Sequence, residues 1–159
     1  MREAFGGEFM IRLMLVFIVI YIGFAAVSLN YAKAFRVKNK VISYIEEHDI
    51  TNLENLNCEN GLAPIISNLE YTKTCNNGND IIYNDEEQIA GYCCNGVVII
   101  IKEITDNNYT YTVNTYADWN IKAINNMIKS FNSDKSYKYV NSGGFKISGE
   151  ATVKKRKTS

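Results

Sequence analysis

Four cysteines are the side chains of this sequence best suited to covalent chemistry, namely Cys58, Cys75, Cys93 and Cys94. No pair has the Cys-x-x-Cys spacing that zinc sites and thioredoxin-like motifs use. Four cysteines in a small domain are typical of two disulfides in an oxidising compartment, and four buried thiols are the alternative. Adjacent Cys93 and Cys94 would point to opposite faces of a strand. We therefore expect them to pair separately, with Cys58 and Cys75 in either order.

Other patterns that could carry chemistry indicate no enzyme. The only histidine, His48, follows two glutamates at the end of a helical pattern, where a surface role is expected. The acidic residues 85–87 could bind calcium, but a solvated turn is the simpler interpretation. No Gly-rich phosphate loop is present, and the net charge is zero. We expect no catalytic residue, metal or cofactor, no nucleic-acid partner and no small-molecule substrate.

An uncharged apolar segment indicates a membrane helix. Residues 13–29 are apolar apart from Tyr21, Gly23 and Ser28, and residues 9–11 lengthen the segment to about 20 residues, enough for the ~30 Å hydrocarbon core. A buried core helix would show a polar face, which this segment lacks. We predict a short tail at residues 1–8 and a single transmembrane helix at residues 9–29. A cleaved signal peptide ending near residues 26–28 is the alternative, although the amino terminus is not clearly basic.

The helical pattern continues past the apolar segment, through residues 30–50. Apolar side chains recur there at steps of three, four and seven, which is the helix period. They are Tyr31, Ala34, Phe35, Val41, Ile42 and Ile45. We therefore expect one helix of about 40 residues, of which the second half is amphipathic and packs on the domain.

Residues 51–153 are expected to form that domain, followed by a basic tail at residues 154–159. Capping-box spacing at residues 51–54 predicts a short helix that stops near Gly61, and Pro64 begins another turn or two. The apolar residues from Trp119 to Phe131 predict a helical stripe, with Trp119 filling the core as the alternative, and a turn is expected at residues 142–144. The predicted fold class is α+β, a long N-terminal helix packed on a small antiparallel β-sheet. The strands are expected at residues 81–83, 88–93, 97–104, 109–116 and 145–153, the last of them an edge strand.

The residues 6–9, Gly-Gly-Glu-Phe, precede the apolar segment, and the residues 30–37, Asn-Tyr-Ala-Lys-Ala-Phe-Arg-Val, follow it. Over residues 6–48 the chain resembles the TadE-like branch of the bacterial type IV pilin-like proteins. The resemblance implies a non-catalytic minor subunit of a pilus or related secretion machine, with Glu8 meeting a neighbouring subunit's amino terminus. Its partners would be the lipid bilayer and other pilin-like subunits, contacted through the N-terminal helix. The family's processing glycine lies several residues before the glutamate, whereas Gly7 adjoins Glu8.

The orientation of the domain is predicted by two signals that conflict. Four basic residues follow the apolar segment within eleven positions and two precede it, which favours a cytoplasmic domain. The cysteines and the resemblance favour the outside. We expect a single-pass protein of the cytoplasmic membrane with an extracytoplasmic C-terminal domain. A membrane-anchored accessory or binding domain with no filament role, or a secreted protein, is the alternative.

Overall fold

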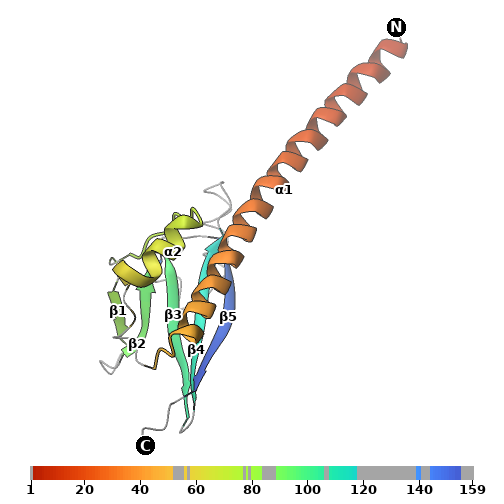
Figure 1. Ribbon diagram of the computed structural model, residues 1–159. Coiled ribbons are helices and arrows are strands. Elements are labelled where there is room, and N and C mark those ends of the chain that lie inside the picture. Colours follow the sequence, from red (N-terminus) through yellow and green to blue (C-terminus); the bar gives the residue numbers. More distant parts are fainter. Residues whose placement is uncertain are drawn as a thin grey trace, which may run out of the picture.

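In the computed structural model of the chain, one helix begins far outside a small domain and ends within it (Figure 1). The structure describes residues 2–51, 56, 58–76, 78, 80–83, 89–105, 108–117, 139–140 and 144–154. A long apolar helix and a five-stranded antiparallel sheet make up the described part, so the predicted α+β class is confirmed.

The helix α1 runs from Arg2 to Glu47 without interruption. No proline lies within it, and Gly23 costs only about 1 kcal/mol relative to alanine. It ends where Asp49 adopts a left-handed conformation, with φ of 47°. The amide of Ile50 donates to the carbonyl of Ile45 at 3.2 Å. The amide of Asp49 donates to the carbonyl of Glu46 at 3.4 Å. This is the Schellman pattern, which satisfies carbonyls at a helix end.

The sheet is a simple antiparallel meander in which each strand pairs with the next along the chain. Strand β5 lies at one edge, as expected. A two-residue turn of Asn95 and Gly96, with φ of 43° and 74°, joins β2 to β3. Such a turn suits the right-handed twist of the strands it connects. The strands are β1 (Asp80–Tyr83), β2 (Ile89–Cys94), β3 (Val97–Ile104), β4 (Asn108–Ala117) and β5 (Phe145–Lys154).

A short helical segment precedes the sheet and corrects one expectation. The π-helical turn η2 (Cys58–Leu62) leads directly into α2 (Ala63–Asn68), so the predicted stop near Gly61 is wrong. Burial of Leu62 and Ile66 holds the segment in place. A Cβ at position 61 would meet the hydroxyl of Tyr44, so a larger residue there would require the Tyr44 side chain to shift. Pro64 lies in the first turn of α2, as predicted.

Three other predicted features lie outside the described residues. They are the beginning of the short helix at residues 52–55, the stripe around Trp119, and the turn at residues 142–143.

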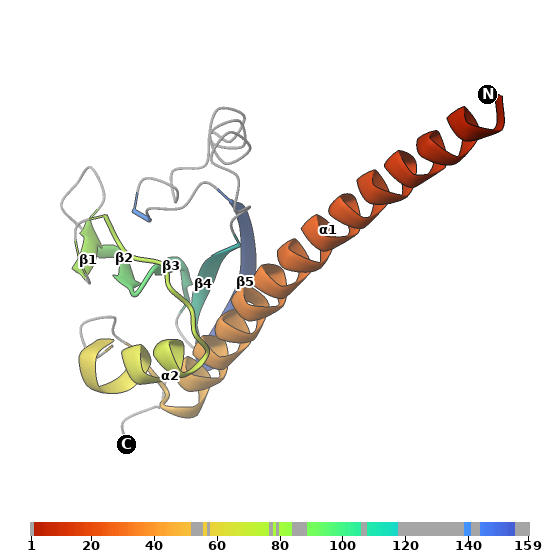
Figure 2. The same ribbon diagram turned by 90° about the horizontal axis from the view of Figure 1, so that it is seen from above.

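The hydrophobic core has one part on each face of the sheet. The larger part lies between the sheet and the helices α1 and α2, which cover the same face (Figure 2). The smaller part, on the other face, includes Ile82, Val98 and Val140. Helix α1 contributes four fully buried side chains, Ala34, Val37, Val41 and Ile45. Tyr31 and Phe35, although at helical spacing, remain exposed and stack on one another with ring centroids 6.5 Å apart.

Candidate assembly helix and paired disulfides

The first half of α1 touches little of the domain. From Gly7 to Ala26 every side chain is exposed. Within the described residues this is one helix long and apolar enough to cross a membrane, judged by length and composition. The core helix of a soluble protein would be mostly buried, and none of this segment is. A signal sequence near the amino terminus would have the same composition.

Glu8, the candidate assembly residue, has a partner on its own helix. Its carboxylate forms an ion pair with the guanidinium of Arg12, one turn further on. Both side chains are more than half exposed, and such a pair contributes only about 0.3–0.5 kcal/mol in water. In hydrocarbon the pairing would matter far more, because an isolated charge there is costly. The spacing of four residues, with the acid first, is the sequence signal that could have identified this pair.

The four candidate cysteines form two disulfides, Cys58–Cys94 and Cys75–Cys93. The adjacent cysteines on β2 pair separately, as predicted, and the structure resolves the order that the sequence left open. Cys94 belongs to the core part beneath α1 and α2, whereas Cys93 belongs to the core part on the opposite face. Strand β2 is therefore covalently bound to segments on both faces of the sheet.

Each disulfide attaches to β2 a segment that belongs to none of the five strands. The Cys58–Cys94 bond holds η2, and with it α2, against the sheet. The Cys75–Cys93 bond holds an extended segment on the other face, where Cys75 also forms a backbone bridge with Val140. The amide of Asn76 donates to the carbonyl of Tyr139 at 2.9 Å.

Polar contacts hold the second half of α1 to the domain at both ends. Near its entry, the hydroxyl of Thr115 on β4 donates to the carbonyl of Ala34 at 3.0 Å. Near its end, the amide of Thr152 on the edge strand β5 donates to the carboxylate of Glu46 at 3.3 Å. Helix and sheet therefore form one packed unit from Ala34 onward.

An ion pair also connects α1 with the residues after α2. The ammonium of Lys33 lies 2.6 Å from a carboxylate oxygen of Glu70. The hydrogen bond and the positive charge of Lys33 hold the pKa of the Glu70 carboxyl below its ordinary value. Glu70 is exposed, so this pair adds little to stability in water.

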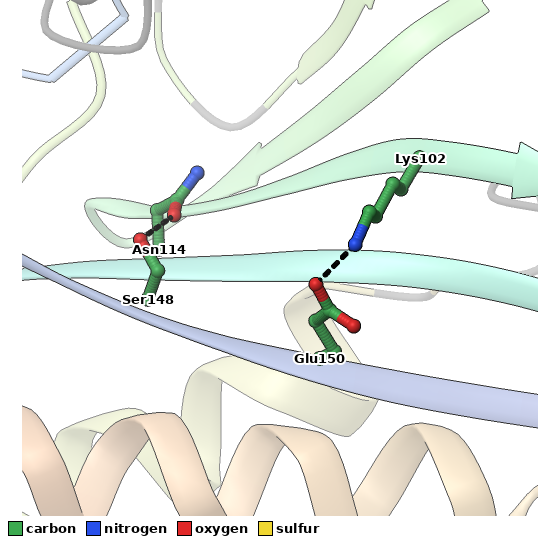
Figure 3. A network of polar contacts seen from close by, with 4 residues as sticks. All are labelled: Lys102, Asn114, Ser148 and Glu150. Carbon is green, nitrogen blue, oxygen red and sulfur yellow. Dashed lines mark hydrogen bonds and ion pairs between the residues drawn. The ribbon is translucent and has the colours of Figure 1, made fainter.

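On the sheet face opposite the helices, polar side chains of β3, β4 and β5 contact one another. Figure 3 shows the hydroxyl of Ser148 donating to the side-chain oxygen of Asn114 at 2.7 Å, and an ion pair between Lys102 and Glu150. These contacts tie the edge strand to the middle of the sheet. Cross-strand pairs of this kind stabilise a sheet modestly.

The remaining candidates of the sequence show no assembled chemistry. His48 lies at the end of α1, where its Nδ1 is 3.0 Å from the carbonyl of Tyr44 and its ring stacks on that tyrosine. Within the described part of the chain, no group of three or more His, Cys, Asp or Glu side chains could hold a metal ion. Residues 85–87 lie outside the described residues.

Comparisons with protein-family models, with curated proteins and with solved structures find no significant match for this chain.

Proposed function

We propose that this protein is a membrane-anchored, pilin-like structural subunit, non-catalytic, that assembles with similar subunits through its N-terminal helix. The observation that carries the proposal is the division of α1. Residues 7–26 are mostly apolar and all exposed, and the second half of the helix supplies four buried side chains to the core of a sheet domain. A helix that served only as a membrane anchor would not need to continue rigidly into the domain.

The physical properties of the exposed half suit two environments. In a bilayer, about 20 apolar residues span the hydrocarbon core. In a filament, the same surface would pack on the apolar helices of neighbouring subunits. Since α1 is continuous and fixed to the sheet, a domain and its helix would move between the two environments as one body. The resemblance of residues 6–48 to TadE-like pilin-like proteins supports a role for this helix in a filament.

We place the domain outside the cytoplasmic membrane. Two disulfides are stable in oxidising compartments and are rare in the cytoplasm. Impermeant maleimide applied to intact cells should label the cysteines only after reduction from outside. Labelling that requires lysis and no reductant would place the domain in the cytoplasm and remove the pilin proposal.

A second candidate is a membrane-anchored accessory domain that forms no filament. The Glu8–Arg12 ion pair favours it, because a carboxylate already neutralised on its own helix does not need a neighbour's amine. The two candidate functions predict different effects on contacts between subunits when Glu8 and Arg12 exchange their charges.

Reversal of both charges, Glu8→Arg with Arg12→Glu, keeps the intrahelical pair but moves the acid by one turn. A photocrosslinker at the exposed Val16 would report subunit contacts in intact cells. If the subunit proposal is correct, the parent and the Arg12→Ala variant crosslink to other subunits, whereas Glu8→Ala and the reversed pair do not. Carbonate extraction should leave every variant in the membrane. An absence of crosslinks in the parent would favour the accessory domain. Crosslinks that survive Glu8→Ala would show that subunits assemble without Glu8, which would then be an interfacial carboxylate only.

A further inference from the structure

Three aromatic side chains are exposed where α1 leaves the domain. The exposed fractions of Tyr31, Phe35 and Phe145 are 49%, 41% and 45%. Tyr31 and Phe35 stack on one face of α1, and the ammonium of Lys38 lies 4.3 Å from the centroid of the Phe35 ring. Tyr31, Phe35 and Lys38 follow one another at helical spacing along one face of α1.

The strand register places Phe145 at the same end of the domain. Ile147 pairs with Thr115, whose hydroxyl contacts the carbonyl of Ala34. Phe145 lies two residues before Ile147, toward the N-terminal end of α1, and on the same face of the sheet as Ile147. Figure 1 shows this end of β4 and β5 beside the point where α1 leaves the sheet.

Along the helix axis, Tyr31 lies within the depth of one headgroup layer beyond the apolar segment, and Phe35 lies just past it. Tyr31 lies about 3 Å and Phe35 about 9 Å beyond Leu29 along the helix axis. Long side chains on a helix point back toward its amino terminus, which brings the Phe35 ring closer to Leu29. The headgroup region of one leaflet is roughly 5–8 Å thick.

We propose that Tyr31, Phe35 and Phe145 form an interfacial belt at the headgroup layer of an anionic phospholipid membrane, and that Arg36 and Lys38, which lie further from the apolar segment, extend their charged ends back to the lipid phosphates. The proposal rests on the membrane insertion of α1 given under the proposed function. Aromatic rings favour the boundary between hydrocarbon and water, and basic side chains extend to lipid phosphates.

Charge and continuity select lipid as the occupant of this surface. Residues 30–45 contain four basic side chains and no acidic one, and Lys33 among them is paired with Glu70. The belt directly continues the exposed apolar surface of α1, of which Leu29 is the last apolar residue before Tyr31. The domain would then sit against the bilayer, because Ala34 is already buried in the core one turn beyond Leu29.

Fluorescence quenching by lipid tests the position of the belt. The full chain would be reconstituted into vesicles of phosphatidylcholine and phosphatidylglycerol, with part of the lipid brominated on the acyl chains. The Phe35→Trp variant reports the belt. The Ile104→Trp variant is the matched control, because Ile104 is also exposed but lies near the distal end of the sheet. The signal of the parent chain, which contains Trp119, is subtracted from both.

If the belt lies at the interface, brominated lipid quenches most of the added fluorescence of Phe35→Trp and almost none of that of Ile104→Trp. Equal, weak quenching in a protein that floats with the vesicles would overturn the belt and leave the membrane anchor standing. Crosslinking of position 35 to a second copy of the chain, without quenching, would also overturn it. A protein that does not float would overturn both the anchor and the belt.

Charge reversal tests the role of the basic side chains. In the Phe35→Trp background, Arg36→Glu with Lys38→Glu should reduce the quenching in phosphatidylglycerol vesicles, because the carboxylates are repelled by the headgroups. Lys154→Glu, at the far end of β5, should leave it unchanged. Unchanged quenching in the Arg36→Glu/Lys38→Glu variant would overturn the contact between these two basic side chains and anionic lipid.

Discussion

Cys93 and Cys94 are consecutive residues of β2, and their disulfides leave the sheet on opposite faces. The partner of Cys94 lies 36 residues away along the chain, and the partner of Cys93 lies 18 residues away. In the chain-entropy model, closing loops of these lengths stabilises the folded state by about 3–4 kcal/mol each. For a small core this is a large share of the free energy of unfolding.

Thiol counting on paired cysteine replacements tests this connectivity. The matched double variant Cys58→Ser/Cys94→Ser should contain no free thiol after unfolding, because Cys75 and Cys93 remain joined. The mismatched variant Cys58→Ser/Cys93→Ser leaves Cys75 and Cys94 on opposite faces of the sheet, so we expect two free thiols. The opposite pattern would show that the cysteines are paired the other way.

Glu70 occupies a backbone conformation that glycine prefers. Its φ is 53°, and its amide donates to the carbonyl of Ser67 at 2.9 Å where α2 ends. A side chain in this region costs of order 1 kcal/mol, which the exposed ion pair with Lys33 offsets only in part. We predict that Glu70→Gly has a higher free energy of unfolding than Glu70→Ala, by about 1 kcal/mol, because both variants lose the ion pair and only glycine relieves the strain.

Denaturant unfolding of the detergent-solubilised chain measures this difference. Lys33→Ala is the control, since it removes the ion pair and leaves the backbone of residue 70 unchanged. Its loss of stability should be small at pH 7. It should shrink further as the pH falls through the lowered pKa of Glu70, because protonation removes the charge that Lys33 stabilises. If Glu70→Gly and Glu70→Ala are equally stable, the left-handed conformation carries no strain.

The sequence predicted the elements of this fold better than their contacts. The helical period through Ile45 and the alternation from Tyr109 were local signals, and α1 and β4 follow them. The Asn95-Gly96 pair between two apolar strands was a hairpin signal that the sequence analysis overlooked.

Other features depend on where the sheet lies relative to the helices. The apolar stripe predicted from the helical period included Phe35 and omitted Val37, yet Val37 is buried and Phe35 is exposed, because the sheet covers only one side of α1. The expected helix end at Gly61 was wrong for a similar reason. The glycine there makes room for Tyr44 of another helix, which no local pattern reveals.

Tyr111 should make the domain sensitive to alkaline pH. The side chain is 1% exposed, and its burial, with a smaller contribution from Tyr109, raises its pKa to about 12. In the unfolded chain the phenol would titrate near its ordinary value of 10. Because the folded state holds the proton more tightly, the resulting stability is fully present below pH 10 and is lost as the pH rises toward 12.

Absorbance of tyrosinate and unfolding at a series of pH values would test this prediction. The Tyr111→Phe variant should lose less stability between pH 10 and pH 12 than the parent, by up to about 2–3 kcal/mol. Its difference spectrum against the parent should show one tyrosine titrating with a midpoint near 12 while the protein is folded. Tyr83→Phe is the matched control. Because Tyr83 is exposed, removing its hydroxyl should not alter the loss of stability between pH 10 and pH 12. If Tyr111 instead titrated near its ordinary value of 10 in the folded domain, the phenol would be accessible to water.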